Sequence, residues 1–435
     1  MELNTWLEND RFGMFIHWGL YSLGARHEWL QKLEAIHPDK YQEYMKKFNP
    51  DLYDPTLWAK AANNAGMKFF CITTKHHDGF CLWDSKYTDF KATNTPYGKD
   101  VLKPMVSAFN NEGLKTGLYY SLIDWHHPDF VIDSVHPLSS HPDKSQMNKS
   151  RDQKRYIQYM YNQVRELLEL YDPVDMLFFD FSYPNWFAWP PNLEHQWVGK
   201  DRTDWGSIEL LKMIRKIQPR VLINERLDLN DVQDGWDFRT PEQFEPRQWL
   251  EYNGKRVPWV TIHTFSGSWG YFRDETSWKS VSQLIQTLIN VVSKGGSLLL
   301  NVGPTGRGEF DERAIDRLNG IGQWMRQHCR SIYGCTAAPE AFESPEHCVY
   351  TYNPKTNRLY LHIYTWPTTH LHLEGMAQKV EYAQFLHDAS QICLEADELV
   401  AHQIGGSINK NTLMLTLPTI KPNVAVPVIE LFLKT

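Results

Sequence analysis

The first three-quarters of the sequence alternates short apolar runs with amphipathic segments, and this alternation constrains the fold more than any other feature. Two of the amphipathic segments, residues 156–170 and 281–292, repeat apolar side chains at helical spacing. Strands that are apolar throughout and separated by such helices are typical of a parallel sheet with helices outside it. We expect strands at residues 13–18, 67–73, 114–121, 174–179, 221–225, 259–263 and 297–302. This number of units favours an eight-stranded, TIM-like (β/α)8 barrel, in which one or two strands are hard to place from the sequence.

After about Cys335 the pattern changes to short strand-like runs joined by turns that contain Asn, Pro or Gly. The expected strands are residues 348–352, 358–364, 380–385, 412–417 and 428–433. Closely spaced strands without helices between them predict an antiparallel β-sandwich. We therefore expect an α/β protein of two domains, a (β/α)8-like barrel over residues 1–335 and a C-terminal β-sandwich over residues 336–435.

Charge and composition exclude several classes of protein. With 45 Lys and Arg against 52 Asp and Glu, the net charge of −7 argues against a general nucleic-acid binder and against a polybasic membrane-surface protein. No apolar run approaches the roughly 18 residues of a membrane span, so we expect no membrane insertion. No secretory leader is recognisable, and the six cysteines show no CxxC spacing. These features favour free thiols and a cytoplasmic location, and a trimmed secreted protein would share them.

Function in such a barrel collects at the carboxyl ends of the strands, so the side chains there are the candidate site. Asp180 stands out because it follows four apolar residues and should end a strand in a partly dry setting. A helix cap or an ion pair in a loop would explain the same carboxylate without any function. Other strand ends carry polar or aromatic side chains: His17, His76, His77, Tyr119, Tyr120 and Arg226.

These side chains favour a sugar site over a metal site. His76 and His77 are adjacent, and neighbouring side chains of an extended segment point in opposite directions, so the two rarely reach one ion. The chain also lacks an HExxH motif and has 17 Trp, 21 Tyr and 21 Phe. Aromatic rings stack on the C–H face of a sugar, while His, Arg and carboxylate groups bond its hydroxyls.

Seven segments carry a specific family resemblance. They are residues 12–19 (FGMFIHWG), 75–80 (KHHDGF), 119–121 (YYS), 174–180 (VDMLFFD), 224–226 (NER), 268–271 (SWGY) and 295–304 (GGSLLLNVGP). In this order, over about residues 10–335, they closely resemble the α-L-fucosidases of glycoside hydrolase family 29. The resemblance implies a retaining glycosidase that hydrolyses terminal α-L-fucosyl linkages of glycans, with a TIM-like barrel and a β-sandwich. It also implies that no metal or organic cofactor takes part.

The resemblance assigns roles residue by residue. Asp180 matches the family nucleophile, and Phe178 and Trp269 match aromatic positions of the pocket wall. The residues that match positions holding the fucose hydroxyls and ring are His17, Glu28, Trp29, His76, His77, Tyr119 or Tyr120, and Arg226.

The general acid/base is harder to assign, because its position varies within the family. Many members carry it in a Trp-Glu pair, but the corresponding pair here is Trp259-Val260. Other members draw the acid from a segment similar to residues 237–242, which makes Glu242 the expected acid/base, with Glu245 and Glu251 as alternatives. Since Glu242 follows a proline, a carboxylate in the first turn of a helix is the competing interpretation.

Three other functions remain open at this stage. The absent Trp-Glu carboxylate would also fit a catalytically impaired fucose-binding protein. A glycosidase for a related sugar, such as an α-L-galactoside, would share most of the site. A metal-dependent hydrolase using the histidines is the third. Linkage preference is not encoded in these motifs, and a homo-oligomer is compatible with the sequence.

Overall fold

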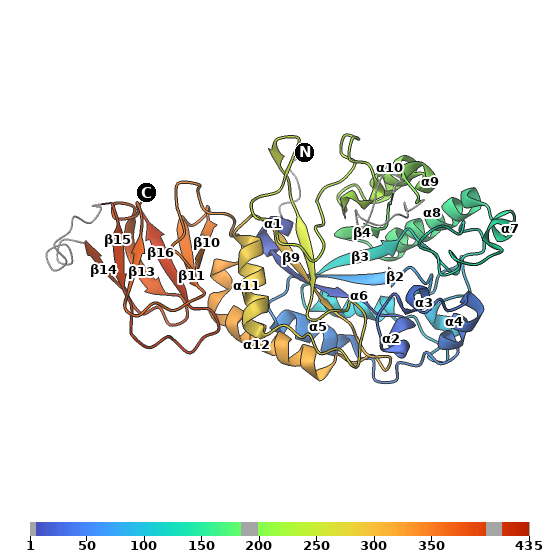
Figure 1. Ribbon diagram of the computed structural model, residues 1–435, viewed down its shortest axis with the longest axis horizontal. Helices are drawn as coiled ribbons and strands as arrows, with labels where there is room; N and C mark the ends of the chain where they lie inside the picture. Colours follow the sequence, from blue (N-terminus) through green and yellow to red (C-terminus); the bar gives the residue numbers. More distant parts are fainter. Residues whose placement is uncertain (1–5, 184–198, 397–410, 435) are drawn as a thin grey trace.

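The computed structural model describes residues 6–183, 199–396 and 411–434. Its larger part is built on one curled parallel sheet with the strand order β5-β4-β3-β2-β1-β9-β8 (Figure 1). The strands are β1 (Phe12–Ile16), β2 (Phe69–Lys75), β3 (Lys115–Ser121), β4 (Met176–Asp180), β5 (Leu222–Ile223), β8 (Val260–Thr264) and β9 (Ser297–Val302). All seven correspond to expected strands, so the apolar runs did identify the sheet.

An irregular segment occupies the space between the two edge strands of this sheet. Phe238 forms a parallel bridge with Asn224, next to β5, and Glu242 forms another with Ile262 in β8. The segment between them is polar and contains Pro241, which has no N–H to donate to a ladder. The run from Phe238 to Glu242 therefore takes the place of the eighth barrel strand, which the apolar pattern did not locate.

Helices cover the outside of the sheet (Figure 1). The longer ones are α4 (Pro38–Met45), α5 (Pro55–Asn64), α6 (Leu102–Asn111), α8 (Gln153–Leu170), α10 (Ser207–Ile217), α11 (Val281–Val292) and α12 (Glu312–His328). α8 begins where the side chain of Asp152 accepts a hydrogen bond from the backbone of Lys154, and α11 begins with a capping box. Within the described ranges no helix is both long and apolar enough to span a bilayer.

Shorter elements lie in the connections. They are α1 (Trp6–Asp10), α2 (Tyr21–Gly24), α3 (Leu30–Leu33), α7 (Lys144–Asn148), α9 (Arg202–Trp205), η1 (Ala92–Asn94), η2 (Glu225–Leu227), η3 (Cys329–Ser331) and the hairpin β6 (Glu251–Tyr252) with β7 (Lys255–Arg256). The polar connection that leads from β3 to α8 contains α7 and buries Phe130 and His136 completely. Buried side chains therefore anchor this connection to the rest of the molecule.

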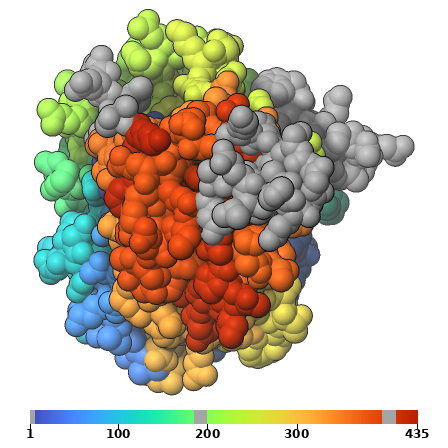
Figure 2. Space-filling model, turned by 90° about the vertical axis from the view of Figure 1, so that its left-hand side faces the viewer, coloured from blue at the N-terminus to red at the C-terminus, as the bar shows by residue number. Residues whose placement is uncertain are grey.

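The C-terminal region forms two antiparallel sheets, at the end of the molecule that faces the viewer in Figure 2. One has the order β10 (Cys348–Asn353), β11 (Arg358–Ile363), β16 (Val428–Leu433), β13 (Val380–Phe385), and the other β12 (His370–Leu373), β15 (Leu413–Thr416), β14 (Cys393–Ala396). Leu359, Leu415 and Ile429 belong to one buried apolar cluster. The expected sandwich is thus present, with β12 and β14 added to the five expected strands.

Helices α11 and α12 lie between this sandwich and the barrel sheet (Figure 1). The indole of Trp324 in α12 donates to the carbonyl of Val426 at 2.8 Å, and the Tyr364 hydroxyl donates to Asn290 of α11 at 2.8 Å. The domain limits at residues 335 and 336 stay a prediction. All six cysteines are free thiols.

Candidate active site

A cavity of about 350 Å³, partly open to solvent, lies among side chains from the carboxyl ends of the barrel strands. The lining residues are Phe15, His17, Glu28, Trp29, His76, His77, Tyr119, Phe178, Asp180, Phe181, Glu242, Ile262 and Trp269. Most of the side chains singled out in the sequence therefore meet at one place.

Asp180 is the last residue of β4, and its side chain is 13% exposed in the cavity. One carboxylate oxygen accepts a hydrogen bond from the Tyr119 hydroxyl at 2.8 Å. The other accepts from the Arg226 guanidinium at 2.6 Å. The two donors fix the orientation of the carboxylate. Asp180 caps no helix, and its ion pair lies in the cavity wall instead of a remote loop.

Arg226, in η2, links the two carboxylates of the site. Its Nη1 donates to Asp180, and its Nη2 donates to Glu242 at 2.9 Å, while Nε donates to the Thr240 hydroxyl at 3.0 Å. Burial by itself lowers the pKa of Arg226, but the negative charges of Asp180 and Glu242 outweigh it and raise the pKa above its ordinary value. A permanent cation thus holds both carboxylates beside each other.

Glu242 reaches the cavity from the irregular eighth strand, and its side chain is 44% exposed. It does not begin a helix, because the chain around it bridges to β8. Glu245 instead accepts a hydrogen bond from Asn290 of α11 at 3.1 Å. Glu251 is exposed on the β6–β7 hairpin. Of these three glutamates, only Glu242 lines the cavity.

Three histidines form one side of the cavity. His17 Nδ1 lies 2.6 Å from the Asn301 side-chain oxygen, and His77 Nδ1 lies 2.7 Å from the Ser121 hydroxyl. Burial lowers the pKa of His17 and of His77 to about 3, and it lowers the pKa of His76 well below its usual value. The rings are therefore neutral at ordinary pH. In the parts of the chain that the structure describes, no three His, Cys, Asp or Glu side chains are grouped as metal ligands.

The rim of the cavity is aromatic. The Trp29 ring lies 5.1 Å from that of His77, and the Trp269 ring lies 5.2 Å from that of His17. Glu28 is buried next to this rim, where it accepts a hydrogen bond at 2.9 Å from the backbone N–H of Gly270. Glu28 thereby holds the segment that carries Trp269.

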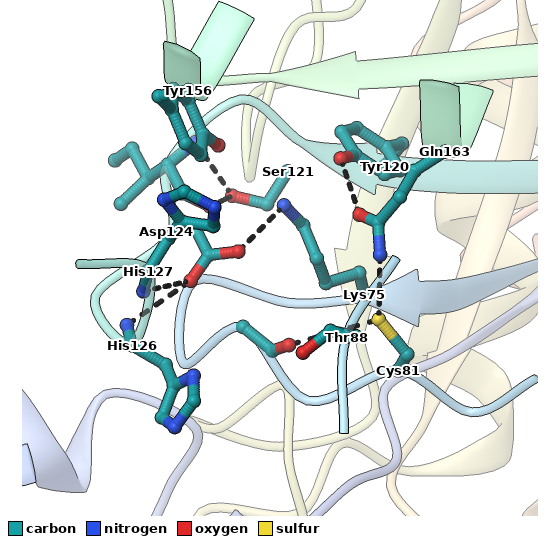
Figure 3. A network of polar contacts seen from close by, with 12 residues as sticks. Lys75, Cys81, Thr88, Tyr120, Ser121, Asp124, His126, His127, Tyr156 and Gln163 are labelled. Atoms are coloured by element: carbon teal, nitrogen blue, oxygen red, sulfur yellow. Dashed lines mark hydrogen bonds and ion pairs between the residues drawn. The ribbon is translucent and has the colours of Figure 1, made fainter. Parts of the chain in front are cut away.

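Tyr120 is the predicted contact that the structure places elsewhere. Its hydroxyl donates to Gln163 of α8 at 2.8 Å, in the network of Figure 3, and its side chain is fully buried. Successive strand residues point to opposite faces, so Tyr119 faces the barrel interior and Tyr120 faces the helices. Of the two tyrosines offered as alternatives, only Tyr119 reaches the cavity.

Three lining residues were not predicted. Phe15 lies two positions before His17, on the same face of the chain, so strand alternation could have identified it. Ile262 faces the cavity from β8, where an apolar side chain carries no distinctive signal. Phe181 has a φ of 76°, an uncommon conformation for an aromatic residue, which turns the chain directly after Asp180.

Comparison with known proteins gives a consistent result. A family model described as "Alpha-L-fucosidase" matches residues 1–330. The human plasma alpha-L-fucosidase is 26% identical in an alignment that covers 93% of this chain and 88% of that protein.

Solved structures agree over nearly the whole chain. Alpha-L-fucosidase isoenzyme 1 from Paenibacillus thiaminolyticus superposes with a TM-score of 0.90 and 40% identity, covering 99% of this chain and 98% of that one. An alpha-L-fucosidase from Bacteroides thetaiotaomicron, with a TM-score of 0.80 and 26% identity, covers 98% of this chain and 95% of its own. That enzyme was captured as a covalent intermediate with 2-fluoro-fucosyl fluoride in a glutamine variant.

Proposed function

Because this chain belongs to the α-L-fucosidase family, glycoside hydrolase family 29, we propose that it removes terminal α-L-fucosyl residues from glycans by a double displacement. The chain is a glycoside hydrolase with a TIM-like barrel and a β-sandwich. The finer claims are that Asp180 forms a covalent fucosyl-enzyme, and that Glu242 is the general acid and then the general base.

The observation that carries the proposal is the pair of carboxylates on one guanidinium. Asp180 and Glu242 both line the cavity, and Nη1 and Nη2 of Arg226 each hold one of them. Retaining glycosidases need two carboxyl groups about 5–5.5 Å apart, whereas inverting enzymes separate them by about 6.5–9.5 Å. Two carboxylates bound to adjacent nitrogens of one planar group favour the closer spacing, and with it retention.

In the first step, a carboxylate oxygen of Asp180 attacks the anomeric carbon, and the glycosidic C–O bond breaks. The leaving oxygen takes the proton of Glu242. Because Glu242 is half-exposed, it can exchange its contact with Arg226 for the glycosidic oxygen when a glycan enters. The hydrogen bonds from Tyr119 and Arg226 hold the Asp180 carboxylate in position for the attack.

In the second step, ionised Glu242 accepts a proton from water, whose oxygen attacks the anomeric carbon and releases Asp180. Arg226 can again donate its hydrogen bond to the Glu242 carboxylate in this step. Two inversions give net retention. No atom of the scheme comes from a metal ion or an organic cofactor.

Selectivity for fucose rests on the apolar part of the wall. Fucose has a methyl group where related sugars have a hydroxymethyl group, and Phe178 or Trp269 would accept that methyl. An apolar pocket rejects a hydroxylated isostere only modestly, by about 10²-fold. An α-L-galactoside is therefore the expected poor substrate. The natural partner of the enzyme is a fucosylated glycan whose remaining sugars lie outside the cavity.

Mechanism-based labelling tests both catalytic roles at once. A 2-fluoro-fucosyl fluoride should attach covalently to Asp180, as found by mass spectrometry of the digested protein. Its fluoride leaves without acid assistance, so a Glu242→Ala variant should still be labelled. That variant should release the sugar more slowly, and azide should accelerate the release.

Labelling of another residue would refute the role of Asp180. Normal turnover in Glu242→Ala, with slow release in Glu245→Ala or Glu251→Ala, would move the acid/base role to that glutamate. Binding of fucose with neither labelling nor turnover would identify a fucose-binding protein. Activity that a chelator removes would indicate the metal-dependent alternative.

A further inference from the structure

We infer that Ser121 and Asn301, which lie behind the cavity, are positioning residues that set the tautomers of His77 and His17. Both imidazoles then present an unprotonated Nε2 to the substrate, so these two side chains accept hydrogen bonds from sugar hydroxyls and donate none. The inference rests on the proposed function, because it concerns how the same cavity selects its sugar.

The tautomer of His17 follows from the Asn301 amide. The amide nitrogen donates to the carbonyl oxygen of Trp269 at 2.6 Å, which leaves the amide oxygen facing His17. An amide oxygen only accepts hydrogen bonds, so the proton in the 2.6 Å contact with Nδ1 belongs to His17. A neutral imidazole carries one N–H, and Nε2 is therefore without a proton.

Ser121 acts on His77 in the same way. Its hydroxyl donates to the carbonyl oxygen of Ile123 at 2.8 Å and accepts from the Ile123 N–H at 3.1 Å. Since a serine hydroxyl has one proton and that proton is used, the contact with His77 Nδ1 requires the histidine to donate. The Nε2 of His77 then faces Asp180, 3.9 Å from its carboxylate. A sugar hydroxyl that contacts both His77 Nε2 and the Asp180 carboxylate meets two hydrogen-bond acceptors. The hydroxyl must therefore be the donor.

A buried ion pair anchors this arrangement, as Figure 3 shows. Lys75, at the end of β2, contacts Asp124 at 3.0 Å, and both side chains are at most 1% exposed. Asp124 also accepts hydrogen bonds from the backbone N–H groups of His126 and His127. This pair joins the end of β2 to the segment after β3, which supplies the carbonyl of Ile123. The backbone that takes the proton of Ser121 is therefore rigidly placed.

His76 provides a contrast within the same wall. Its Nδ1 is buried and has no hydrogen-bond partner among the described residues. Nothing on the protein side sets its tautomer, so His76 can donate or accept as the ligand requires. The wall therefore combines two fixed acceptors with one adaptable group.

Modified sugars show whether a histidine accepts a hydrogen bond from a sugar hydroxyl or donates one to it. Replacing a hydroxyl by hydrogen or by fluorine removes the proton that it donates, and only fluorine remains a weak acceptor. A ring fluorine also slows the glycosidic step by withdrawing electrons, so binding is compared instead of turnover. For the hydroxyl that meets His77, we expect the deoxy and the fluoro analogues of free fucose to lose the same factor in affinity as competitive inhibitors, about tenfold. A fluoro analogue that keeps most of the affinity would overturn the inference.

A Ser121→Ala variant tests the positioning role. It should lower kcat/KM for the parent fucoside by about tenfold, and the penalty for removing that one hydroxyl should shrink by a similar factor. Ser207→Ala is the matched control, because the Ser207 hydroxyl is also buried but has no hydrogen-bond partner among the described residues, and it lies away from the cavity. An unchanged penalty in Ser121→Ala would refute the role of Ser121.

Nitrogen NMR of ¹⁵N-histidine in the whole chain reads the tautomers without any turnover. His17→Gln and His77→Gln variants assign the signals. We expect a protonated Nδ1 and an unprotonated Nε2 for both rings, with the His77 pattern altered in Ser121→Ala. A protonated Nε2 in the unmodified protein would disprove the inference. Failure of the unmodified protein to hydrolyse any α-L-fucoside would instead count against the proposed function.

Discussion

Two carboxylates of this molecule have similar partners in different places. Asp180, in the barrel, accepts hydrogen bonds from a tyrosine and an arginine. Glu430, in the central strand β16 of the C-terminal sheet, also accepts from a tyrosine, Tyr360 at 3.3 Å, and from an arginine, Arg330 at 2.8 Å. Glu430 has a third donor in Gln384 at 2.8 Å. Partner chemistry alone therefore does not mark a catalytic carboxylate.

The surroundings of the two groups differ. The Asp180 side chain borders an open cavity with aromatic walls, whereas that of Glu430 is 4% exposed and lies between strands β11 and β13. Buried histidines also occur both in the cavity and away from it. Burial lowers the pKa of His328 to about 4 and that of His362 to about 3, as low as in the cavity, yet these two lie where the barrel meets the sandwich. A shifted pKa indicates burial, and the cavity is what indicates function.

The largest effect should come from Asp180→Ala. Removing the nucleophile should lower kcat/KM for an aryl α-L-fucoside by at least about 10³-fold, because the covalent step is lost. Glu430→Ala, which removes the matching carboxylate, should leave kcat/KM near its original value. Equal losses in the two variants, measured on folded protein, would contradict the division between the two regions.

For stability we expect a smaller effect, and here Glu430→Ala should be the more damaging of the two substitutions. Glu430→Ala leaves three donors around a buried position without their acceptor, which should lower the free energy of unfolding by about 2–4 kcal/mol. Asp180→Ala should lower the free energy of unfolding by less. Arg226 keeps its hydrogen bonds to Glu242 and Thr240, and water can enter the open cavity. Denaturant titration of both variants measures the difference. A Glu430→Ala protein as stable as the original would show that this network contributes nothing.

The part of the site on regular strands could be predicted from the sequence. An apolar run that ends in a polar residue places that residue at the mouth of a barrel, which holds for His17 and Asp180. Successive side chains of a strand point to opposite faces. This alternation separates Tyr119 from Tyr120, but only once the direction of one neighbouring side chain is known. The family resemblance supplied Glu28 and Trp269, which lie on irregular segments and have no periodic signal.

The parts that could not be predicted depend on tertiary contacts. The eighth strand contains Pro241 and polar residues, and it exists because β5 and β8 leave a gap that its backbone can fill. Strand β12 reads His-Leu-His-Leu, too short to stand out without its partner β15. The positive φ of Phe181 carries no mark in the sequence.

The smallest effect concerns the pH dependence of stability, and it tests whether the buried histidines of the two regions behave alike. His362 has its pKa lowered to about 3 in the folded protein, against about 6.5 when unfolded. Between these values the unfolded chain binds the extra proton, so stability is full above about pH 6.5 and is lost as the pH falls. A His362→Gln variant keeps a donor for Thr351, which His362 bonds at 2.9 Å, but it has no proton to gain.

Between pH 6 and pH 5 this variant should therefore lose about 1 kcal/mol less of its unfolding free energy than the original protein. Its kcat/KM at neutral pH should not change, since His362 lies outside the cavity. A His17→Gln variant should flatten the pH dependence of stability by a similar amount, because burial lowers the pKa of His17 equally. Unlike His362→Gln, the His17→Gln variant should also lose activity, because the Nε2 of His17 is proposed to contact the sugar. Two outcomes would contradict the division between the two regions. One is a loss of activity in His362→Gln, and the other is an unchanged pH dependence of the unfolding free energy in both variants.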